Sequence, residues 1–245
     1  MQWILDHFLQ LILVAAGIVT CAWLLAVRKR LNMKWYAAVL LSAVHVLVGV
    51  LCVKVFARME GANATAMSIF GAVFFMPLFY ILGAKIFRRP LGEVCDLFAV
   101  PMIFTLFCSR FNCLKSGCCL GKLIPGTTTR WPTREAEMVF YIIFLAIMIP
   151  RILKGKTKGK VYPIYMIAYG IFRGIVECFR ESKTPGIFHL THIWCLIAIV
   201  IGLGIYWTIK TKEEKQAPQS LQLHRGHAFA TGSLVTLHKR LKDSR

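Results

Sequence analysis

An apolar stretch at 165–180 carries four polar side chains on what would be one face of a helix, namely Tyr169, Arg173, Glu177 and Arg180. At about 100° per residue, these positions fall within an arc of roughly 80°. Placing a charge in a bilayer costs about 2.5–3.5 kcal/mol even on the mildest scale, so such residues usually face a polar interior and mark a functional site. The alternative is a structural Arg–Glu pair that locks two helices together, but that pair needs neither a second arginine nor a tyrosine on the same face.

A second group of charged and reactive side chains lies in the polar segment Ser109–Glu137. Gly117 and Gly121 indicate tight turns or close backbone approach there, and exposed backbone N–H groups near arginines suit a phosphate. The basic residues of the segment are Arg110, Lys115, Lys122, Arg130 and Arg134, and its cysteines are Cys113, Cys118 and Cys119, which follow Cys108.

These cysteines admit four interpretations. Their C-x4-C-x4-C-C spacing is not that of common zinc sites, which favour paired C-x2–4-C and histidine. A disulfide of Cys113 with Cys118 or Cys119 requires an oxidising compartment. Catalytic thiol chemistry is a third interpretation, because nearby basic side chains can lower a thiol pKa. Packing as small residues is the simplest, and it also suits the cysteines inside the apolar blocks.

Composition identifies the class of protein that must position these groups. The chain has 245 residues, 57% of them hydrophobic and 17% charged, whereas a soluble domain carries about 25% charged residues. The hydrophobic residues come in long blocks, which is typical of a polytopic membrane protein. The net charge of +19 does not indicate nucleic-acid binding, because lysine and arginine cluster in short loops between the blocks. We expect no cleavable signal peptide, since the first block is too long for one.

Seven apolar blocks predict an all-α fold of about seven transmembrane helices. We expect a transmembrane domain at 1–209 and a basic tail at 210–245 that is disordered or a surface appendage. The fourth block has only 15 residues and contains Asp96 and Pro101, so we expect it to be tilted or partly buried. The blocks are 8–27, 35–56, 64–84, 94–108, 138–149, 161–179 and 193–209.

The distribution of basic loops predicts the orientation in the membrane. The loops after the first, third and fifth spans hold four, three and five Lys and Arg residues, and the tail is basic too. The positive-inside rule places these regions in the cytoplasm and the N-terminus outside. The loop 109–137 is then an extracytoplasmic exception, and binding an anionic group is the simplest reason for its cations. Arg180 lies at the outer end of its helix, and Arg173 lies about 10 Å deeper.

Together the loop and the charged helix resemble the prolipoprotein diacylglyceryl transferase family. The family's signature, Gly-Arg-x-Gly-Asn-Phe-x-Asn-x-Glu-x-x-Gly, corresponds to 109–121, where Arg110 and Gly121 match at the same spacing. A third element, Pro-Ser/Thr-Gln-Leu-Tyr-Glu, corresponds to Pro132–Glu137. The resemblance extends over roughly 68–203. The family's helix motif, Tyr-Gly-x-x-Arg-x-x-x-Glu-x-x-Arg, is matched in full by Tyr169, Gly170, Arg173, Glu177 and Arg180.

The chain departs from the family at three positions and is similar to a divergent member. The signature asparagine is replaced by Cys113 and the signature glutamate by Cys118. The family histidine of a Ser-x-His-Gly context, which serves there as base for the substrate thiol, is Phe70. His189 and His192, just before the last span, are the alternative candidates for that base.

The resemblance implies transfer of a diacylglyceryl group from phosphatidylglycerol to the lipobox cysteine of a prelipoprotein, in a bacterial cell membrane. Arg110 and Arg173 would stabilise the charge on the departing glycerol phosphate, and Arg180 would recruit the headgroup. Glu177 would orient Arg173 or act as a base. The expected partners are the phospholipid, the prelipoprotein signal peptide and the membrane, and no metal or organic cofactor is implied. The remaining expected substrate-binding residues are Tyr169, Gly117, Gly121, Glu137 and Cys113.

Two other functions remain open from the sequence. A non-catalytic or repurposed phospholipid-binding protein on the same scaffold would explain the missing histidine. A membrane thiol-redox protein would instead use Cys113, Cys118 and Cys119. Changing these three cysteines to serine would silence only the redox protein.

Overall fold

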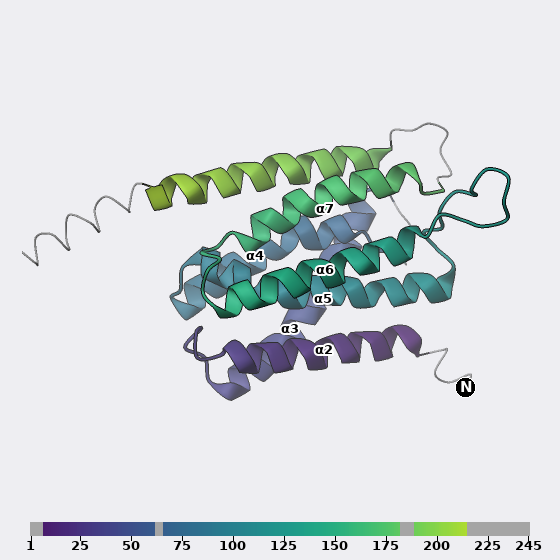
Figure 1. Cartoon of the computed structure of the whole chain (residues 1–245). Coiled ribbons are helices and arrows are strands. Elements are labelled where there is room, and N and C mark those ends of the chain that lie inside the picture. The colour runs from purple at the N-terminus through teal and green to yellow at the C-terminus, as the bar shows by residue number, and fades with distance from the viewer. Residues whose placement is uncertain (1–6, 62–65, 182–188, 215–245) are drawn as a thin grey trace, which may run out of the picture. The chain divides into compact units, whose positions relative to one another are not determined.

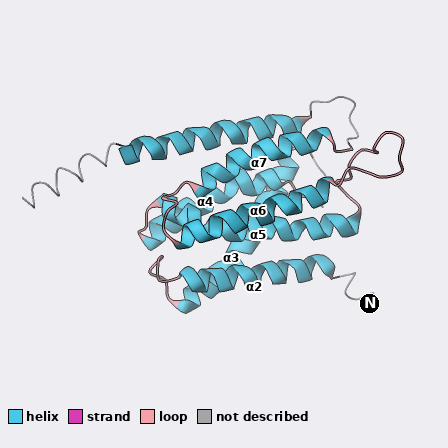
Figure 2. Cartoon of the chain, viewed as in Figure 1, coloured by secondary structure: helices cyan, strands magenta, loops and turns pink. Residues whose placement is uncertain are grey.

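The computed structural model describes residues 7–61, 66–181 and 189–214, and within these ranges the chain is all-helical (Figures 1 and 2). Two isolated bridges are the only β pairings of the described residues. The predicted all-α fold is therefore confirmed. The helices are α2 (Phe8–Val27), α3 (Trp35–Met59), α4 (Ile69–Phe87), α5 (Leu91–Ser116), α6 (Thr133–Leu153), α7 (Val161–Cys178) and the helix Leu190–Glu214.

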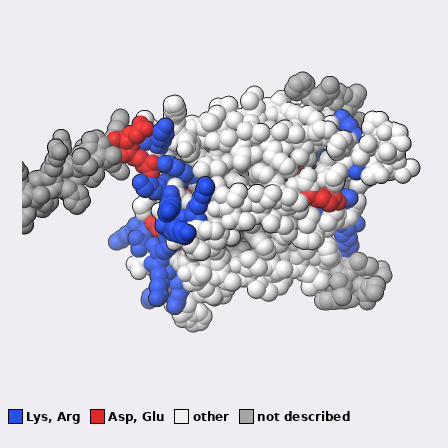
Figure 3. Space-filling view, in the orientation of Figure 1, with Lys and Arg blue, Asp and Glu red and all other residues white. Residues whose placement is uncertain are grey.

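Six of these helices are long and apolar enough to cross a membrane, namely α2 to α6 and Leu190–Glu214. Large apolar side chains stay exposed on them, among them Ile18, Leu40, Leu47 and Ile143. A broad uncharged band separates the basic residues at the two ends of the bundle (Figure 3). Soluble monomers rarely expose a contiguous apolar surface this large, so the protein is a polytopic membrane protein.

The helix α5 forms the centre of the bundle. It packs against α2, α4, α6 and α7, and it is the most deeply buried of the six candidate spans. Leu97, Ala99 and Ile103 are fully enclosed along it. Because α7 contacts both α5 and α6, a polar side chain on the inner face of α7 meets side chains from these two helices instead of lipid.

Two helices, α5 and α6, extend well beyond their expected bounds toward the polar segment. The helix α5 runs from Leu91 to Ser116, not from 94 to 108, so Arg110 and Cys113 lie on a helix. The helix α6 begins at Thr133, not at 138. The loop expected at 109–137 is therefore confined to 117–132. The polar side chains in the last two turns of α5 do not break it, because Arg110 faces the bundle interior and is buried.

A buried carboxylate fixes the start of α7. The two oxygens of Asp96 on α5 accept the backbone N–H groups of Gly159 (2.7 Å) and Val161 (2.9 Å). These N–H groups at a helix start have no partner within the helix, so the carboxylate acts as a cap from a neighbouring helix. Gly92 and Gly159 approach so closely that a Cβ on Gly159 would lie 2.8 Å from the backbone of Gly92. Together these contacts hold α7 in register with α5.

The last described helix continues beyond the expected end of the transmembrane domain, since it runs to Glu214 instead of 209. The chain separates into two compact units, Met1–Leu203 and Gly204–Arg245. Within the second unit, Thr208 donates to the carbonyl of Gly204 (2.7 Å). The rest of the expected basic tail, 215–245, lies outside the described residues.

Candidate functional site

Two arginines from different helices bind the same carboxylate. Arg110 on α5 and Arg173 on α7 form ion pairs with separate oxygens of Glu137, which lies on α6. Their side chains are only 4% and 6% exposed, and that of Glu137 is 2% exposed. Charges buried this deeply are stable only when paired. Three segments far apart in the sequence are therefore joined at one charged centre.

The ion pairs continue along α7 toward its end. The second Nη of Arg173 lies 2.7 Å from Glu177, one turn further along the helix. Arg180 lies 3.4 Å from the same Glu177 oxygen. The charged residues of the expected stripe thus form a continuous ion-pair network, within which Glu177 binds Arg173 on α7 and Arg180 just beyond the end of α7.

The loop 117–132 is joined to the end of α7 through the backbone. The N–H of Lys122 donates to the carbonyl of Phe179 (2.8 Å), and the N–H of Glu181 donates to that of Leu120 (2.9 Å). The guanidinium of Arg130 adds an ion pair to Glu181 at 2.5 Å. These contacts hold the loop across the end of the helix, so it covers one end of the arginine network.

The two expected glycines have backbone roles in this loop. Gly117 caps α5 in the left-handed region at φ +65°, where a side chain would be strained. A Cβ on Gly121 would lie 2.1 Å from the carbonyl oxygen of Trp131, so only glycine fits. The structure therefore assigns both residues to shaping the loop, and a direct role in substrate binding stays a prediction.

Two thiols adjoin the arginines. The Nη2 of Arg180 lies 2.6 Å from the sulfur of Cys119, and Arg110 lies 3.8 Å from that of Cys113. The hydrogen bond with Cys113, aided by the charges of Arg180 and Arg110, lowers the pKa of Cys119 to about 5 although burial acts in the opposite direction. All nine cysteines lie in the described part of the chain, and each is a free thiol, so the disulfide considered from the sequence is not present.

The sequence identified Cys119 as one of three candidate reactive thiols, but it did not predict the contact of Cys119 with Arg180. Its contact with Arg180 depends on a turn in which Cys119 itself adopts φ +60°, a conformation that non-glycine residues rarely adopt. No local pattern in the sequence signals that turn. Cys119 and Arg180 meet because the loop that follows α5 lies against the end of α7 in the folded chain.

Aromatic rings line the network on its inner side. The ring of Tyr169 stacks on those of Tyr165 (5.5 Å) and Tyr141 (5.9 Å), and all three side chains are fully buried. Phe70 of α4 packs against Tyr169 with ring centroids 6.2 Å apart. The position of the expected histidine therefore adjoins the network but is occupied by an apolar ring.

His189 and His192, the alternative candidates for the thiol base, lie at the start of the last described helix. His192 lies at the start of the last described helix, with its Nε2 3.6 Å from the sulfur of Cys178. Its Nδ1 accepts the backbone N–H of His189 (3.1 Å). His45 is buried and contacts the hydroxyl of Tyr80 at 3.3 Å, which agrees with a helix–helix hydrogen bond.

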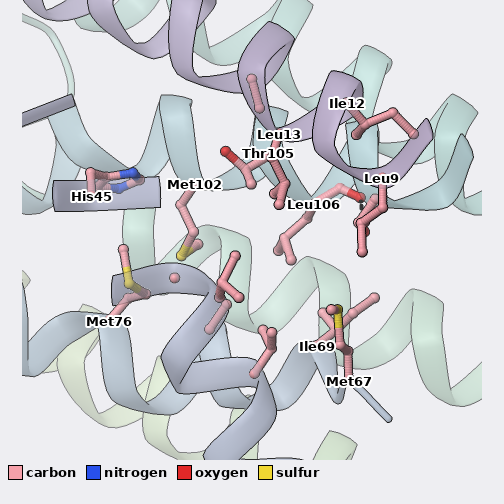
Figure 4. Close-up of a pocket in the computed structure, with 16 residues that line it drawn as sticks. Leu9, Ile12, Leu13, His45, Met67, Ile69, Met76, Met102, Thr105 and Leu106 are labelled. Atoms are coloured by element: carbon pink, nitrogen blue, oxygen red, sulfur yellow. Dashed lines mark hydrogen bonds between the residues drawn. The ribbon is translucent and has the colours of Figure 1, made fainter. Parts of the chain in front are cut away.

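An apolar cavity of about 80 Å³ lies among α2, α3, α4 and α5 (Figure 4). Leu13, Met76 and Met102 are among the side chains that point into it (Figure 4). Its lining also includes Ser109 and Ile69, the immediate neighbours of Arg110 and Phe70. The apolar cavity and the charged centre thus share the helix α5, which is an arrangement suited to an amphiphile.

Comparison of the sequence with known proteins identifies a family. The family described as "Prolipoprotein diacylglyceryl transferase" matches residues 5–208. A relative from Clostridium perfringens (strain 13 / Type A), "Phosphatidylglycerol--prolipoprotein diacylglyceryl transferase 2", is 25% identical over 140 residues, which is 51% of this chain and 55% of the relative. One from Clostridium tetani (strain Massachusetts / E88), "Phosphatidylglycerol--prolipoprotein diacylglyceryl transferase", is 23% identical over 154 residues, 56% of this chain and 62% of the relative.

The chain thus spans between about half and two thirds of the length of these curated relatives. The family match covers more of this chain than the match to either relative, and it includes α2 to α7. It includes the three helices whose side chains meet at Glu137. The chain belongs to the prolipoprotein diacylglyceryl transferase family.

Proposed function

We propose that this protein transfers the diacylglyceryl group of phosphatidylglycerol to the lipobox cysteine of a prelipoprotein in a bacterial cell membrane. The observation that carries this proposal is the buried network in which Arg110, Arg173 and Arg180 share the carboxylates of Glu137 and Glu177. Three guanidinium groups, which are always cationic and form strong hydrogen bonds to phosphate, are gathered here in a largely buried site.

One donor of this network has no partner within the described residues. The Nε of Arg110 is buried and makes no hydrogen bond. Leaving a buried donor unpaired costs about 1–3 kcal/mol, and more when the group is charged. A phosphate oxygen in contact with this N–H would satisfy it. The unpaired donor therefore supports an anionic ligand that is bound between α5 and α7.

The same arginines suit the chemistry of the transfer. As the bond between the glyceryl carbon and the phosphate oxygen breaks, negative charge grows on the departing glycerol phosphate. Fixed guanidinium groups in a site without bulk water stabilise such charge strongly, and removing one comparable donor elsewhere costs about 2.7–4 kcal/mol. Arg180 is the most exposed of the three, at 22%, and so suits the first capture of the headgroup.

The other expected residues take positioning roles in this proposal. Glu137 holds Arg110 and Arg173 at a fixed separation instead of contacting the phospholipid. Glu177 does the same for Arg173 and Arg180. Tyr169 lies close enough to both Arg110 and Arg173 to interact electrostatically, which supports donation from its hydroxyl to a phosphate oxygen.

The apolar cavity supports a lipid substrate. At about 80 Å³ it is too small for a whole acyl chain, so it would hold only the first part of one chain while the remainder lies among membrane lipids. The cavity lies beside α5, on which Ser109 and Arg110 adjoin each other. A phospholipid can therefore place its phosphate at the arginines and an acyl chain along α2 to α5.

The test is a transfer assay with the whole chain in phosphatidylglycerol vesicles. Phosphatidylglycerol labelled in its acyl chains and a lipobox peptide should yield a labelled peptide whose link resists hydroxylamine, as expected for a thioether. A lipobox peptide with serine in place of cysteine is the matched control and should stay unlabelled. Absence of labelled peptide, with the protein folded and the lipid present, would overturn the proposal.

The packing of Phe70 favours a second candidate, a phospholipid-binding protein that does not transfer. Its ring stacks on Phe74 (5.9 Å) and contacts Tyr169 (6.2 Å) where the family's base would lie. In that case the wild-type protein should bind phosphatidylglycerol and lose this binding on Arg173→Ala, yet leave the peptide unlabelled. The same vesicles serve both measurements, so the two candidates are separated directly.

A further inference from the structure

Three cysteine sulfurs converge at the end of α5. Cys113 lies in the last turns of α5, and Cys118 and Cys119 follow the turn at Gly117. Their three sulfur atoms all lie within 4.8 Å of one another, and those of Cys118 and Cys119 are 3.6 Å apart. The thiols were brought together by the left-handed conformations of Gly117 and Cys119, so their sequence spacing does not resemble a familiar metal motif.

The separations fit a tetrahedral zinc ion. Zinc–sulfur bonds of about 2.3 Å in tetrahedral geometry place the sulfurs about 3.8 Å apart. Cys118 and Cys119 already meet this distance, and shifts of about 1 Å or less bring Cys113 into range. Zinc sites with three protein ligands and one open position are those that bind a reacting group, whereas purely structural sites have four.

We propose that Cys113, Cys118 and Cys119 bind one Zn²⁺ ion, whose open fourth position takes the acceptor thiol of the prelipoprotein. This inference rests on the proposed transferase function. It assigns the activation of the thiol, for which the chain has no histidine at position 70, to a metal ion. Two of its three ligands, Cys113 and Cys118, replace the signature asparagine and glutamate of the family.

The charges around the thiols agree with this site. A bare cation would be repelled by arginines, but Zn²⁺ bound by three thiolates carries a net charge of −1. Arg180 lies 2.6 Å from the sulfur of Cys119, and Arg110 lies 3.8 Å from that of Cys113. Guanidinium groups at these distances stabilise thiolate ligands. The same two arginines belong to the proposed phosphate site, so an acceptor thiol on the metal would lie beside the phospholipid.

The chemical step balances without a redox partner. The acceptor thiol loses its proton to solvent as it binds, because a zinc-bound thiol is deprotonated. A sulfur lone pair then attacks the glyceryl carbon that carries the phosphate. The carbon–sulfur bond forms as the carbon–oxygen bond breaks, and that electron pair leaves with glycerol phosphate. The product is a neutral thioether, which binds zinc weakly and dissociates.

Cobalt substitution tests the metal site without measuring transfer. The full-length protein, purified in detergent without oxygen and treated with a chelator, is titrated with Co²⁺ alone. We expect one Co²⁺ per chain, with the intense near-ultraviolet absorption of cobalt thiolates and the visible bands of a tetrahedral ion, both of which Zn²⁺ abolishes. The triple variant Cys113→Ser, Cys118→Ser, Cys119→Ser should show neither. Cys178→Ser, which removes another exposed thiol, is the matched control and should bind like the wild type.

Addition of a lipobox peptide tests the open position. The visible bands should shift with the cysteine peptide and stay unchanged with its serine counterpart. The proposal is overturned if the wild type shows no thiolate absorption or if the triple variant absorbs equally. It is also overturned if the purified protein has a disulfide among the three cysteines, or if the visible bands do not change when the cysteine peptide is added.

Transfer activity then separates the two proposals. If labelled peptide forms at full rate in protein stripped of metal, the transferase stands and the zinc site is wrong as its thiol activator. If the cobalt spectra appear and respond to the peptide but no labelled peptide forms, the metal site stands and the transferase is wrong. The expected result is transfer that falls at least tenfold on chelation and returns with Zn²⁺.

Discussion

Arg110 and Arg173 bind opposite oxygens of a single carboxylate, that of Glu137, although they come from α5 and α7. Two like charges held this near each other repel, so the carboxylate is what allows them to be neighbours. The second Nη of Arg173 lies 2.7 Å from Glu177, and the Nε of Arg110 is buried without a hydrogen-bond partner among the described residues. An anion that accepts from this Nε is attracted by both guanidinium groups, and this shared attraction is the physical basis of the proposed site.

Replacing Arg173 by lysine should reduce transfer while keeping the charge. Lysine cannot donate to Glu137 and Glu177 from two separate nitrogens as the guanidinium does. We expect kcat/KM to fall by about 10²–10³-fold, the cost of one lost donor to a developing oxyanion. Arg58→Lys makes the same change at an exposed position in the last turn of α3 and should leave the rate unchanged. Equal rates for both variants would rule out Arg173 as a phosphate ligand.

Replacing Glu137 by glutamine should destabilise the bundle. The change removes the shared partner of Arg110 and Arg173 and leaves two buried cations close together. Removing one member of a buried ion pair costs about 3–5 kcal/mol, so thermal unfolding in detergent should begin at a clearly lower temperature. Glu181→Gln breaks only the exposed pair with Arg130, for which about 0–1 kcal/mol is expected. If Glu137→Gln lowers the unfolding temperature no more than Glu181→Gln does, the central role of this carboxylate is contradicted.

Filling the apolar cavity should weaken lipid use without harming the fold. Gly49 lines the cavity, and a Cβ there would have only the Met76 sulfur within 4.0 Å. Gly49→Leu adds apolar volume to the cavity and removes a helix-interior glycine, which costs about 1 kcal/mol relative to alanine. We expect an equal or higher unfolding temperature together with a KM for phosphatidylglycerol that rises several-fold.

The matched variant is Gly17→Leu on α2. No atom lies within 4 Å of its would-be Cβ, and Gly17 is not among the cavity lining. It should raise stability in the same way but leave KM unchanged. A KM that is unaffected by Gly49→Leu, or affected equally by both variants, would remove the cavity from the proposed lipid site.

The sequence predicted the existence of the helices better than their ends. Hydropathy located each long apolar block, because bilayer and bundle interior both require continuous apolar surface. It failed at the end of α5, where polar residues indicated a loop although Arg110 is buried inside the bundle. A window average cannot distinguish a polar residue that faces water from one that faces a buried carboxylate.

The charged site was predictable in part, because the spacing of Arg173 and Glu177 places them on one helix face, and Arg180, just beyond the helix end, still reaches Glu177. The role of Glu137 was expected to be substrate binding, but the structure places it between two arginines. The sequence grouped the three cysteines, but it did not predict that the turns at Gly117 and Cys119 bring their sulfur atoms together. The apolar cavity depends on how four separate helices meet, and no local pattern encodes that.

Membrane orientation can be tested with single added cysteines. Thr128 is exposed in the loop 117–132, and Lys156 is exposed in the basic segment between α6 and α7. The positive-inside rule places the basic segment in the cytoplasm. In intact cells an impermeant maleimide should therefore label Thr128→Cys above the parent protein, whereas Lys156→Cys should be labelled only after lysis. The opposite pattern would invert the topology and place the arginine site on the cytoplasmic side.

Restoring a histidine at position 70 tests how the acceptor thiol is activated. Phe70 is 4% exposed, and its ring packs against Phe74 and Tyr169. An imidazole there buries a polar group without an evident partner, at a cost of about 1–3 kcal/mol, so Phe70→His should unfold at a lower temperature.

If zinc activates the thiol, the imidazole has no proton left to remove, and transfer by Phe70→His should stay within about twofold of the wild type in the vesicle assay. Phe74→His makes the same substitution one turn further along α4 and controls for the loss of packing. A gain of tenfold or more at position 70, absent at position 74, would show that a base and not a metal ion limits the reaction. Such a gain would also return Cys113, Cys118 and Cys119 to a purely structural role.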